Sequence, residues 1–404
     1  MRHPAVLLLI AQACLAQGFT QRGFLETRFL GFPQTVPGDS GRAVGEAFLR
    51  WEPSFKPVPG LQVFGVLDAR VDSHRQADRA WDLDWQDRRR RRPPFALRRL
   101  SALYHRGPLT AEIGKQFIRW GKADILNPTD RFAPRDFLAV VDNEFLAVTA
   151  ARLTWESPAH TVDLVWTPRF TSSRLPLLNQ RWAALPEGIA VTESPPRFPG
   201  GPQFGARWSR RAARLEHSFS FFQGFNHLPL LDIRVLPALP FRFRVEPFYA
   251  RMRMAGAEAA LPLPWLTVKA EAAYFTSSTR QADEYVLYVI QLERQTGEWF
   301  LVGGYAGEAV TRSRAGLDFA PDRGLARAFL GRAGYNIDPN RSIAVEAAVR
   351  HNGRGVWTRA EYSQALGRHW RATAGFTWMA GKQGDFLGQY RRNSHASLAL
   401  RFSF

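Results

Sequence analysis

The side chains of this sequence that are best suited to chemistry gather in one stretch, RWGKADILNPTDRFAPRDF. Four basic and three acidic side chains alternate between Arg119 and Phe137. Guanidinium and ammonium groups at this density suit the binding of anionic solutes, while interleaved carboxylates suit a loop that is fixed by ion pairs. The basic candidates are Arg119, Lys122, Arg131 and Arg135, and the candidate loop-locking acids are Asp124, Asp130 and Asp136.

Two interpretations of this stretch remain open from its residues. The run Asn127-Pro128-Thr129-Asp130 predicts a turn, because Pro restricts φ and Asn or Asp side chains cap the local backbone. In the first interpretation, residues 121–144 form a long loop that narrows a channel and whose bases select solutes. In the second, the same loop is a plug that is held still by ion pairs between its acids and the bases beside them.

Catalytic and metal-binding motifs are not found in the sequence. A hydrolase would need a nucleophile beside a positioned His, and the one weak candidate, His217 with Ser218 and Ser220 in HSFSFF, is typical of ordinary strand alternation. No His pair has metal-binding spacing, and no glycine-rich phosphate loop is present. The single cysteine, Cys14, lies in the N-terminal segment. We therefore expect no enzyme activity, no metal site and no cofactor.

The N-terminus has the features of a secretory signal peptide over residues 1–16. A basic start is followed by the apolar run Ala5 to Ala13, and Cys14 and Ala16 place small residues at the cleavage site. The run is too short to span a bilayer as a helix. In an alternative interpretation Cys14 is the acylated residue of a lipoprotein, although Gln12 does not suit that motif.

The formal charge is +18, and it comes almost wholly from arginine. Such a charge favours anionic partners such as phosphates, carboxylates and lipopolysaccharide, and export makes nucleic acid an unsuitable partner. The run Arg88 to Arg92 is five consecutive arginines. Its guanidinium groups suit phosphates of lipopolysaccharide or an anionic solute, but a solvated charge run has the same sequence.

Segments that alternate apolar and polar residues with a period of two recur along the chain. In SHASLALRFSF, Leu398, Leu400 and Phe402 share one face, and Ser397 and Arg401 lie on the other. The same pattern is present in HWRATAGFTWM, SIAVEAAVR, LTVKAEAAYF and LQVFGVLDARV. After the N-terminal segment no run of about 18 apolar residues occurs, which excludes membrane-spanning helices.

Alternating segments of about ten residues are typical of a transmembrane β-barrel with apolar residues outward and polar residues inward. Nineteen segments qualify, and the even strand number of such barrels reduces them to eighteen. We therefore predict an all-β, antiparallel up-and-down barrel over residues 17–404, located in the outer membrane of a Gram-negative bacterium. The predicted long extracellular loops are 73–96, 121–144, 171–203 and 223–240, with short periplasmic turns between the other strands.

Charged residues on the polar faces of these strands are predicted to line the lumen. A modest excess of guanidinium there favours anions. In the alternative, most of these charges pair across neighbouring strands and only fill the lumen. The inward bases are Arg28, Arg50, Arg70, Arg152, Arg169, Arg251, Arg253, Lys269, Arg350, Arg359, Arg371 and Arg401, and the inward acids are Glu26, Glu46, Asp68, Glu112, Asp163, Glu271, Glu346 and Glu361.

Three features together resemble the alginate-export porins and their relatives among bacterial outer-membrane barrels. They are the pattern RWG, NP, D and PRD between Arg119 and Asp136, the segment KAEAAYF from Lys269 to Phe275, and the closing Phe404. The resemblance implies an outer-membrane barrel of about eighteen strands with an arginine-rich, polar lumen. It also implies that the barrel-assembly machinery recognises the C-terminal segment through Phe404.

The leading functional hypothesis is an outer-membrane channel for small anionic or polyhydroxylated solutes, with specificity set by the inward arginines and the loop 121–144. A second hypothesis is a plugged barrel from which apolar molecules leave sideways into lipid. A third is a closed barrel whose outer loops serve binding or structure. In each case we expect outer-membrane lipids and lipopolysaccharide to surround the protein.

Overall fold

The computed structural model describes residues 18–80, 82–124, 126–185, 188, 190–237, 242–314 and 316–404. The predicted signal peptide, residues 1–16 with Cys14, lies outside the described residues. The regular secondary structure of the described chain is β-strand, apart from the short helix α2 (Pro321–Gly324) and the 3-10 helix η1 (Gly388–Asn393). No helix among the described residues is long and apolar enough to cross a membrane.

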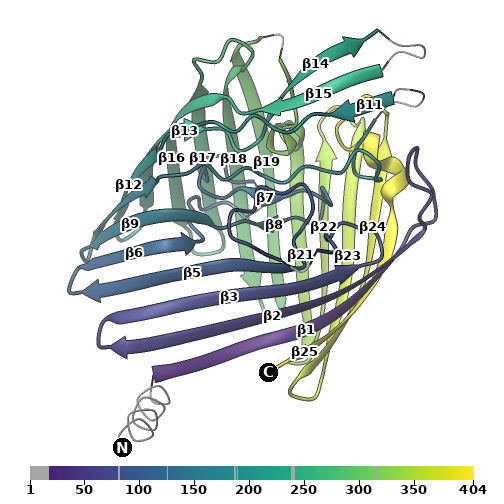
Figure 1. Ribbon diagram of the computed structural model, residues 1–404. Coiled ribbons are helices and arrows are strands. Elements are labelled where there is room, and N and C mark those ends of the chain that lie inside the picture. The colour runs from purple at the N-terminus through teal and green to yellow at the C-terminus, as the bar shows by residue number, and fades with distance from the viewer. Residues whose placement is uncertain are drawn as a thin grey trace, which may run out of the picture.

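Eighteen strands of the described chain close into one antiparallel barrel, which confirms the predicted fold class (Figure 1). Pairing of the first strand with the last closes the ring. The barrel strands are β1 (Phe19–Gly31), β2 (Ala43–Val58), β3 (Leu61–Asp72), β5 (Phe95–Arg106), β6 (Leu109–Gln116), β9 (Val148–Glu156), β10 (His160–Thr167), β12 (Gln203–Arg211), β13 (Glu216–Phe225), β16 (Arg251–Pro262), β17 (Thr267–Thr276), β18 (Glu284–Thr296), β19 (Trp299–Arg312), β21 (Ala328–Asp338), β22 (Arg341–Arg350), β23 (Gly355–Leu366), β24 (Trp370–Gly381) and β25 (His395–Ser403).

The connections differ in length between the two ends of the barrel. At the end that carries the start of β1 and the C-terminus, here called the inner end, tight turns such as 59–60, 107–108 and 339–340 join the strands (Figure 1). The opposite end, here called the long-loop end, carries the extended connections, as predicted. The connection after β13 runs to residue 250 rather than to 240, because it forms two further strands, β14 (Leu230–Leu236) and β15 (Arg242–Phe248). These pair with β11 (Ala190–Glu193) and β20 (Leu317–Asp318) in a separate sheet.

The outer face of the barrel carries an apolar band that suits contact with lipid. On β25, for example, Leu398 is 58 % exposed on the outside, while Arg401 points inward and pairs with Glu26. In such a barrel the backbone N–H and C=O groups hydrogen-bond to neighbouring strands, and the apolar side chains face the bilayer. The same outer face carries Leu153, Leu164, Trp166, Phe204, Phe219, Phe221, Ile290, Phe329 and Phe376, all exposed.

Strand β16 departs from the predicted orientation. The prediction placed Arg251 and Arg253 in the lumen, but both are exposed on the outer face, and Met252 and Met254 are buried inside. The two methionines join an apolar cluster that fills this part of the lumen. The rule that polar residues point inward assumes a water-filled lumen, and it therefore fails where the interior is apolar.

Candidate functional site

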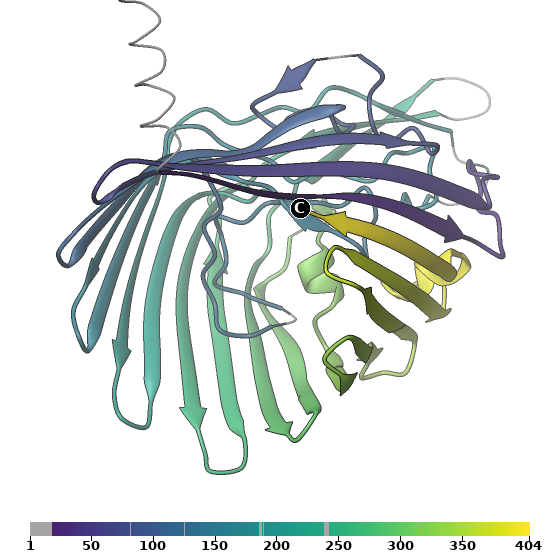
Figure 2. The same cartoon turned by 90° about the horizontal axis from the view of Figure 1, so that it is seen from below.

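The connection between β6 and β9, residues 117–147, folds into the barrel, and we call it the inward loop. It contains two short paired strands, β7 (Arg135–Asp136) and β8 (Glu144–Phe145), which lie inside the ring of barrel strands (Figure 1). Seen from below, chain crosses the interior of the ring of strands (Figure 2). This segment therefore folds into the barrel, as predicted. Three sets of contacts hold the inward loop in place.

The first set of contacts is apolar and lies against β10, β12 and β13. Trp120 is 2 % exposed, its indole nitrogen donates to Asp163 at 2.9 Å, and its ring meets Phe132 edge-on at 5.2 Å. Phe132 in turn contacts Phe222 at 5.1 Å. Gly205 on the wall makes room for both loop rings, since a Cβ there would lie 2.5 Å from Phe132 and 2.7 Å from Trp120.

The second set of contacts ties the loop backbone to strands on the other side of the lumen. Glu271 on β17 accepts hydrogen bonds from the backbone amides of Lys122 at 3.1 Å and Thr129 at 2.8 Å. Gln291 on β18 accepts one from the amide of Asp124 at 3.0 Å. The sequence separation is 149 residues for Lys122 and Glu271 and 167 residues for Asp124 and Gln291, so the loop crosses the lumen and is fixed at both walls.

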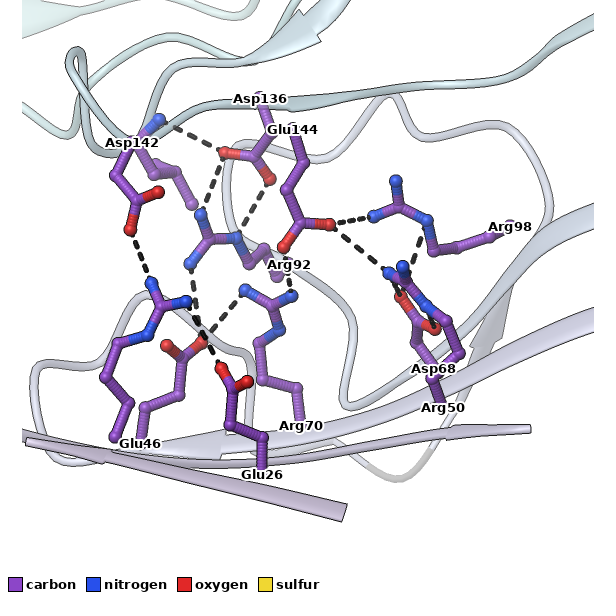
Figure 3. Close-up of polar contacts among 12 residues, drawn as sticks. Glu26, Glu46, Arg50, Asp68, Arg70, Arg92, Arg98, Asp136, Asp142 and Glu144 are labelled. Atoms are coloured by element: carbon purple, nitrogen blue, oxygen red, sulfur yellow. Dashed lines mark hydrogen bonds and ion pairs between the residues drawn. The ribbon is translucent and has the colours of Figure 1, made fainter. Parts of the chain in front are cut away.

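The third set of contacts is a cluster of arginines and acids beneath β1, β2, β3 and β5 (Figure 3). Glu144 pairs with Arg70 at 2.9 Å and Arg50 at 3.3 Å, and also with Arg98. Burial alone would raise the pKa of the Glu144 carboxyl, but the attraction of Arg70, Arg98 and Arg50 outweighs it and holds the pKa well below its usual range. Glu144 is therefore ionised and locks the loop to the wall at neutral pH.

Two more loop acids extend this cluster. Asp136 pairs with Arg92 at 2.9 Å and with Arg174, both from outer connections. Burial acts to raise the pKa of Asp136, and the two guanidinium groups lower it below its usual value. Asp142 pairs with Arg28 on β1 and with Arg359 on β23 at 3.8 Å. The loop is thus locked by ion pairs, but mostly to the wall and to other loops rather than within itself.

None of the predicted loop-locking pairs between sequence neighbours is an ion pair among the described residues. Asp130 pairs with Arg119 at 2.5 Å inside the loop. Asp124 instead pairs with Lys269 on β17 at 3.3 Å, and Asp136 does not pair with Arg135. Sequence proximity is a poor guide here because the loop is extended across the lumen, which brings distant strands nearer than neighbouring side chains.

The four basic side chains of the loop lie in different environments. Arg119 lies over the ring of Phe145 at 3.6 Å, and Lys122 pairs with Glu216 at 2.6 Å. Arg131 is buried, 3.6 Å from Asp322. Arg135 donates to Asn143 at 3.0 Å and forms no ion pair among the described residues, and burial lowers its pKa. Of the four, Arg135 is the one that lines the cavity left beside the loop.

Most of the predicted strand arginines face the lumen but differ in how far they are neutralised. Besides Arg251 and Arg253, the exception is Arg169, which lies beyond the end of β10 in the outer connection and is exposed. Arg70 pairs with Glu46 at 2.9 Å, and its side chain is 9 % exposed. Arg152, Arg350 and Arg359 pair with Asp163, Asp385 and Glu361 at 2.8, 3.2 and 2.9 Å. Arg371 is exposed near the inner end, where it donates to the hydroxyl of Ser363 at 2.9 Å. The lumen wall is therefore mostly neutralised, as in the alternative of cross-strand pairing.

Open space remains between the inward loop and the strands β19, β21, β22 and β23. This inner cavity has a volume of about 330 Å³. Its polar lining includes Arg135 and Asn143 of the loop and Arg332 and Glu346 of the wall. A second hollow of about 590 Å³, the outer vestibule, lies toward the long loops. Phe386 and Tyr390 belong to the lining of both hollows.

Sequence reasoning missed the apolar part of this passage. Val302, Leu330 and Trp357 point into the inner cavity from barrel strands, where apolar side chains were expected to face lipid. Phe386 and Tyr390 come from the connection before β25. One signal was available for Trp357, because it shares the parity of Arg359 on the same strand. The described residues hold no group of three or more His, Cys, Asp or Glu that could bind a metal ion.

Comparisons with known proteins identify the fold. No protein-family model and no curated protein matches the chain. Among solved structures it is similar to a BenF-like porin from Pseudomonas fluorescens Pf-5, with 11 % identity, a TM-score of 0.56, and coverage of 96 % of this chain and 98 % of that one. It is also similar to OccAB3 of Acinetobacter baumannii, at 8 % identity and TM-score 0.55, covering 96 % and 99 % of the two chains.

A third similar structure is OpdQ of Pseudomonas aeruginosa, at 10 % identity and a TM-score of 0.54 over 96 % of this chain and 98 % of that one. The chain therefore has the porin-type eighteen-strand barrel fold along nearly its whole length. At these identities the likeness concerns the fold alone. The resemblance to alginate-export porins is not confirmed by these comparisons.

Proposed function

We propose that the protein is an outer-membrane channel of the porin type that passes small anionic or polyhydroxylated solutes. The observation that carries the proposal is the one-sided filling of the lumen: the inward loop packs against most of the wall and leaves the inner cavity beside β19 to β23. Long inward connections of this kind are usually functional. The outer apolar band and the porin-type fold support a location in the outer membrane.

A preference for anions is supported by the arginines that keep solvent contact toward the inner end. The side chains of Arg332 and Arg401 are 47 % and 41 % exposed even though they pair with Glu346 and Glu26. Arg371 has no ion-pair partner among the described residues. Arg70, in contrast, is nearly buried within the charged cluster. Charged side chains that line a pore set its ion preference, so the exposed arginines are the ones we propose to select solutes.

The cavity lining also suits hydroxyl groups and apolar carbon. Asn143, Asp124 and Glu346 offer hydrogen-bond acceptors, and Trp357 and Phe386 offer apolar surface. The lateral route for apolar molecules is less well supported, because each barrel strand pairs with both neighbours around the ring. A channel along the barrel axis is therefore the function that the geometry supports best.

The test is single-channel recording of the purified protein in planar bilayers, with reversal potentials measured in a salt gradient. We expect an anion-selective current in the wild type and a fall in the anion-to-cation permeability ratio of about threefold in R332Q/R371Q, in line with the removal of two charges that line the pore. Replacing residues 126–143 by a short Gly-Ser linker should raise the conductance severalfold.

The matched control is R312Q/R327Q, which removes two arginines that are exposed at the long-loop end. Its permeability ratio should equal that of the wild type. A protein that is folded yet silent both before and after the loop is replaced would overturn the channel proposal. An unchanged ratio in R332Q/R371Q would leave the channel standing and reject these arginines as its selectivity residues.

A further inference from the structure

The outer face of β16 carries two arginines that the channel does not use. Arg253 lies opposite Gln223 of β13 and Thr276 of β17, and Arg251 lies opposite Phe225. Toward the inner end, the same outer surface continues with Phe221 and Phe219, 46 % and 55 % exposed. The arginines therefore stand directly at the upper border of the apolar band, at the long-loop end.

Neither guanidinium group has an ion-pair partner among the described residues. The nearest recorded partner of the Arg251 guanidinium is the ring of Phe225, with 5.9 Å to its centroid. Most arginines inside the barrel do have carboxylate partners, as Arg50 and Arg152 do. Two adjacent unpaired cations on a surface that borders lipid indicate that the compensating charge comes from outside the protein.

The two arginines line a cleft of about 360 Å³. Its sides are Gly200, Gly201 and Pro202, which lead into β12, and Thr276 to Ser278, which follow β17. A Cβ at Gly200 or Gly201 would have no heavy atom within 4 Å, so this side of the cleft is open. Gly201 has a φ of +103°, which favours glycine and helps to keep side chains out of the entrance.

The backbone beneath the arginines is held firmly. The amide of Arg251 donates to the hydroxyl of Thr279 at 3.1 Å, and the hydroxyl of Ser277 donates to the carbonyl of Arg251 at 2.5 Å. These bonds fix the backbone at Arg251. Ser278 adds a hydroxyl donor to the lining. Two guanidinium forks with hydroxyl donors beside them match the tetrahedral oxygens of a phosphate group.

We propose that this cleft binds the phosphate group of an anionic lipid in the membrane leaflet at the long-loop end. The phosphate contacts Arg251 and Arg253, and the acyl chains run along Phe221, Phe219 and Tyr274 in the apolar band. This lipid site rests on the part of the proposed function that places the barrel across the outer membrane. It does not require that the barrel transports solutes. A phosphomonoester suits it best, because both guanidinium groups then find negatively charged oxygens.

The test is native mass spectrometry of the full-chain protein released from nanodiscs of phosphatidylcholine with a varied fraction of phosphatidic acid. The wild type should keep phosphatidic acid adducts at a lipid fraction about tenfold lower than R251Q/R253Q does, as for the loss of a charge-assisted contact of about 1.4 kcal/mol. R251K/R253K, which keeps the charges but not the forks, should fall between the two.

The control R312Q/R327Q removes the same number of charges at the same end of the barrel and should bind lipid like the wild type. A second arm adds inorganic phosphate at a large excess, which should not displace the lipid because it lacks acyl chains. Equal adducts in R251Q/R253Q, an equal loss in the control, or displacement by inorganic phosphate would each overturn the lipid site. Circular dichroism checks that each variant is folded. Single-channel current of R251Q/R253Q tests the channel independently, so failure of the lipid site can be distinguished from failure of the channel proposal.

Discussion

The two sides of the lumen differ although one continuous sheet builds both. Along β1 to β18 the wall is covered by the inward loop, which is fixed by aromatic packing at Trp120 and by ion pairs at Glu144. Along β19 to β23 the wall faces the inner cavity, and Arg332 stays 47 % exposed there. The same alternating strands therefore build a filled side and an open side, and what distinguishes the two sides is the path of one connection.

The difference also separates two kinds of lumen arginine. Those on the filled side, such as Arg50 and Arg70, are neutralised by acids of the loop and the wall. Those on the open side and toward the inner end, such as Arg332 and Arg371, retain solvent contact. The first group positions the loop and the second is available to solutes. A count of lumen arginines does not make this distinction. The distinction depends on burial, because Arg332 also has a carboxylate partner, Glu346 at 3.3 Å, yet stays exposed.

Trp120→Ala should have the largest effect on this comparison, because it removes the central ring of the filled side. Truncation of a fully buried aromatic residue costs about 3–5 kcal/mol, and here it also leaves Asp163 without its indole donor. We expect a lower urea midpoint by circular dichroism, together with noisier and larger single-channel currents. Trp265→Ala, at a side chain that is 62 % exposed, should change neither, and equal effects of the two variants would contradict the packing argument.

Glu144→Gln should have a smaller effect, and it tests the difference between the buried and the exposed lumen arginines. The variant keeps the shape but weakens contacts to three arginines, at a cost of about 2–3 kcal/mol for hydrogen bonds to charged groups. It should raise the anion-to-cation permeability ratio, since Arg70 and Arg98 lose a counter-charge. Glu52→Gln, whose partner Arg22 is 82 % exposed, should leave the ratio unchanged. An unchanged ratio would show that these arginines lie away from the passage.

Mild acid should have the smallest effect. The folded-state pKa of Glu144 lies below the usual 4.5, so its contribution to loop attachment is fully present above that value and is lost only as pH falls through the lower, folded value. Asp136 behaves in the same way. Single-channel conductance should therefore stay constant from pH 7 to about pH 5, where both carboxyls are ionised. A widening of the channel within that range would contradict the proposed lock.

Much of the fold follows from the sequence because a barrel in lipid imposes a strict period of two. The pattern at β25, with Leu398 and Leu400 outward and Arg401 inward, is present in the structure as predicted. Strand number, turn positions and the inward direction of Arg70, Arg152 and Arg350 follow from the same local rule. Each of these features depends only on the contrast between lipid outside and a polar lumen inside. That contrast is visible as the alternation of apolar and polar residues along each strand.

The tertiary structure alone decided what fills the lumen. The side reversal of Arg251 and Arg253, the pairing of Asp124 with Lys269, and the cavity beside Trp357 all depend on where the inward loop crosses the barrel. That path is fixed by contacts between residues more than a hundred positions apart, such as Lys122 and Glu271. Alternation along a strand carries no information about such contacts, because their stability arises only when the barrel has closed around the loop.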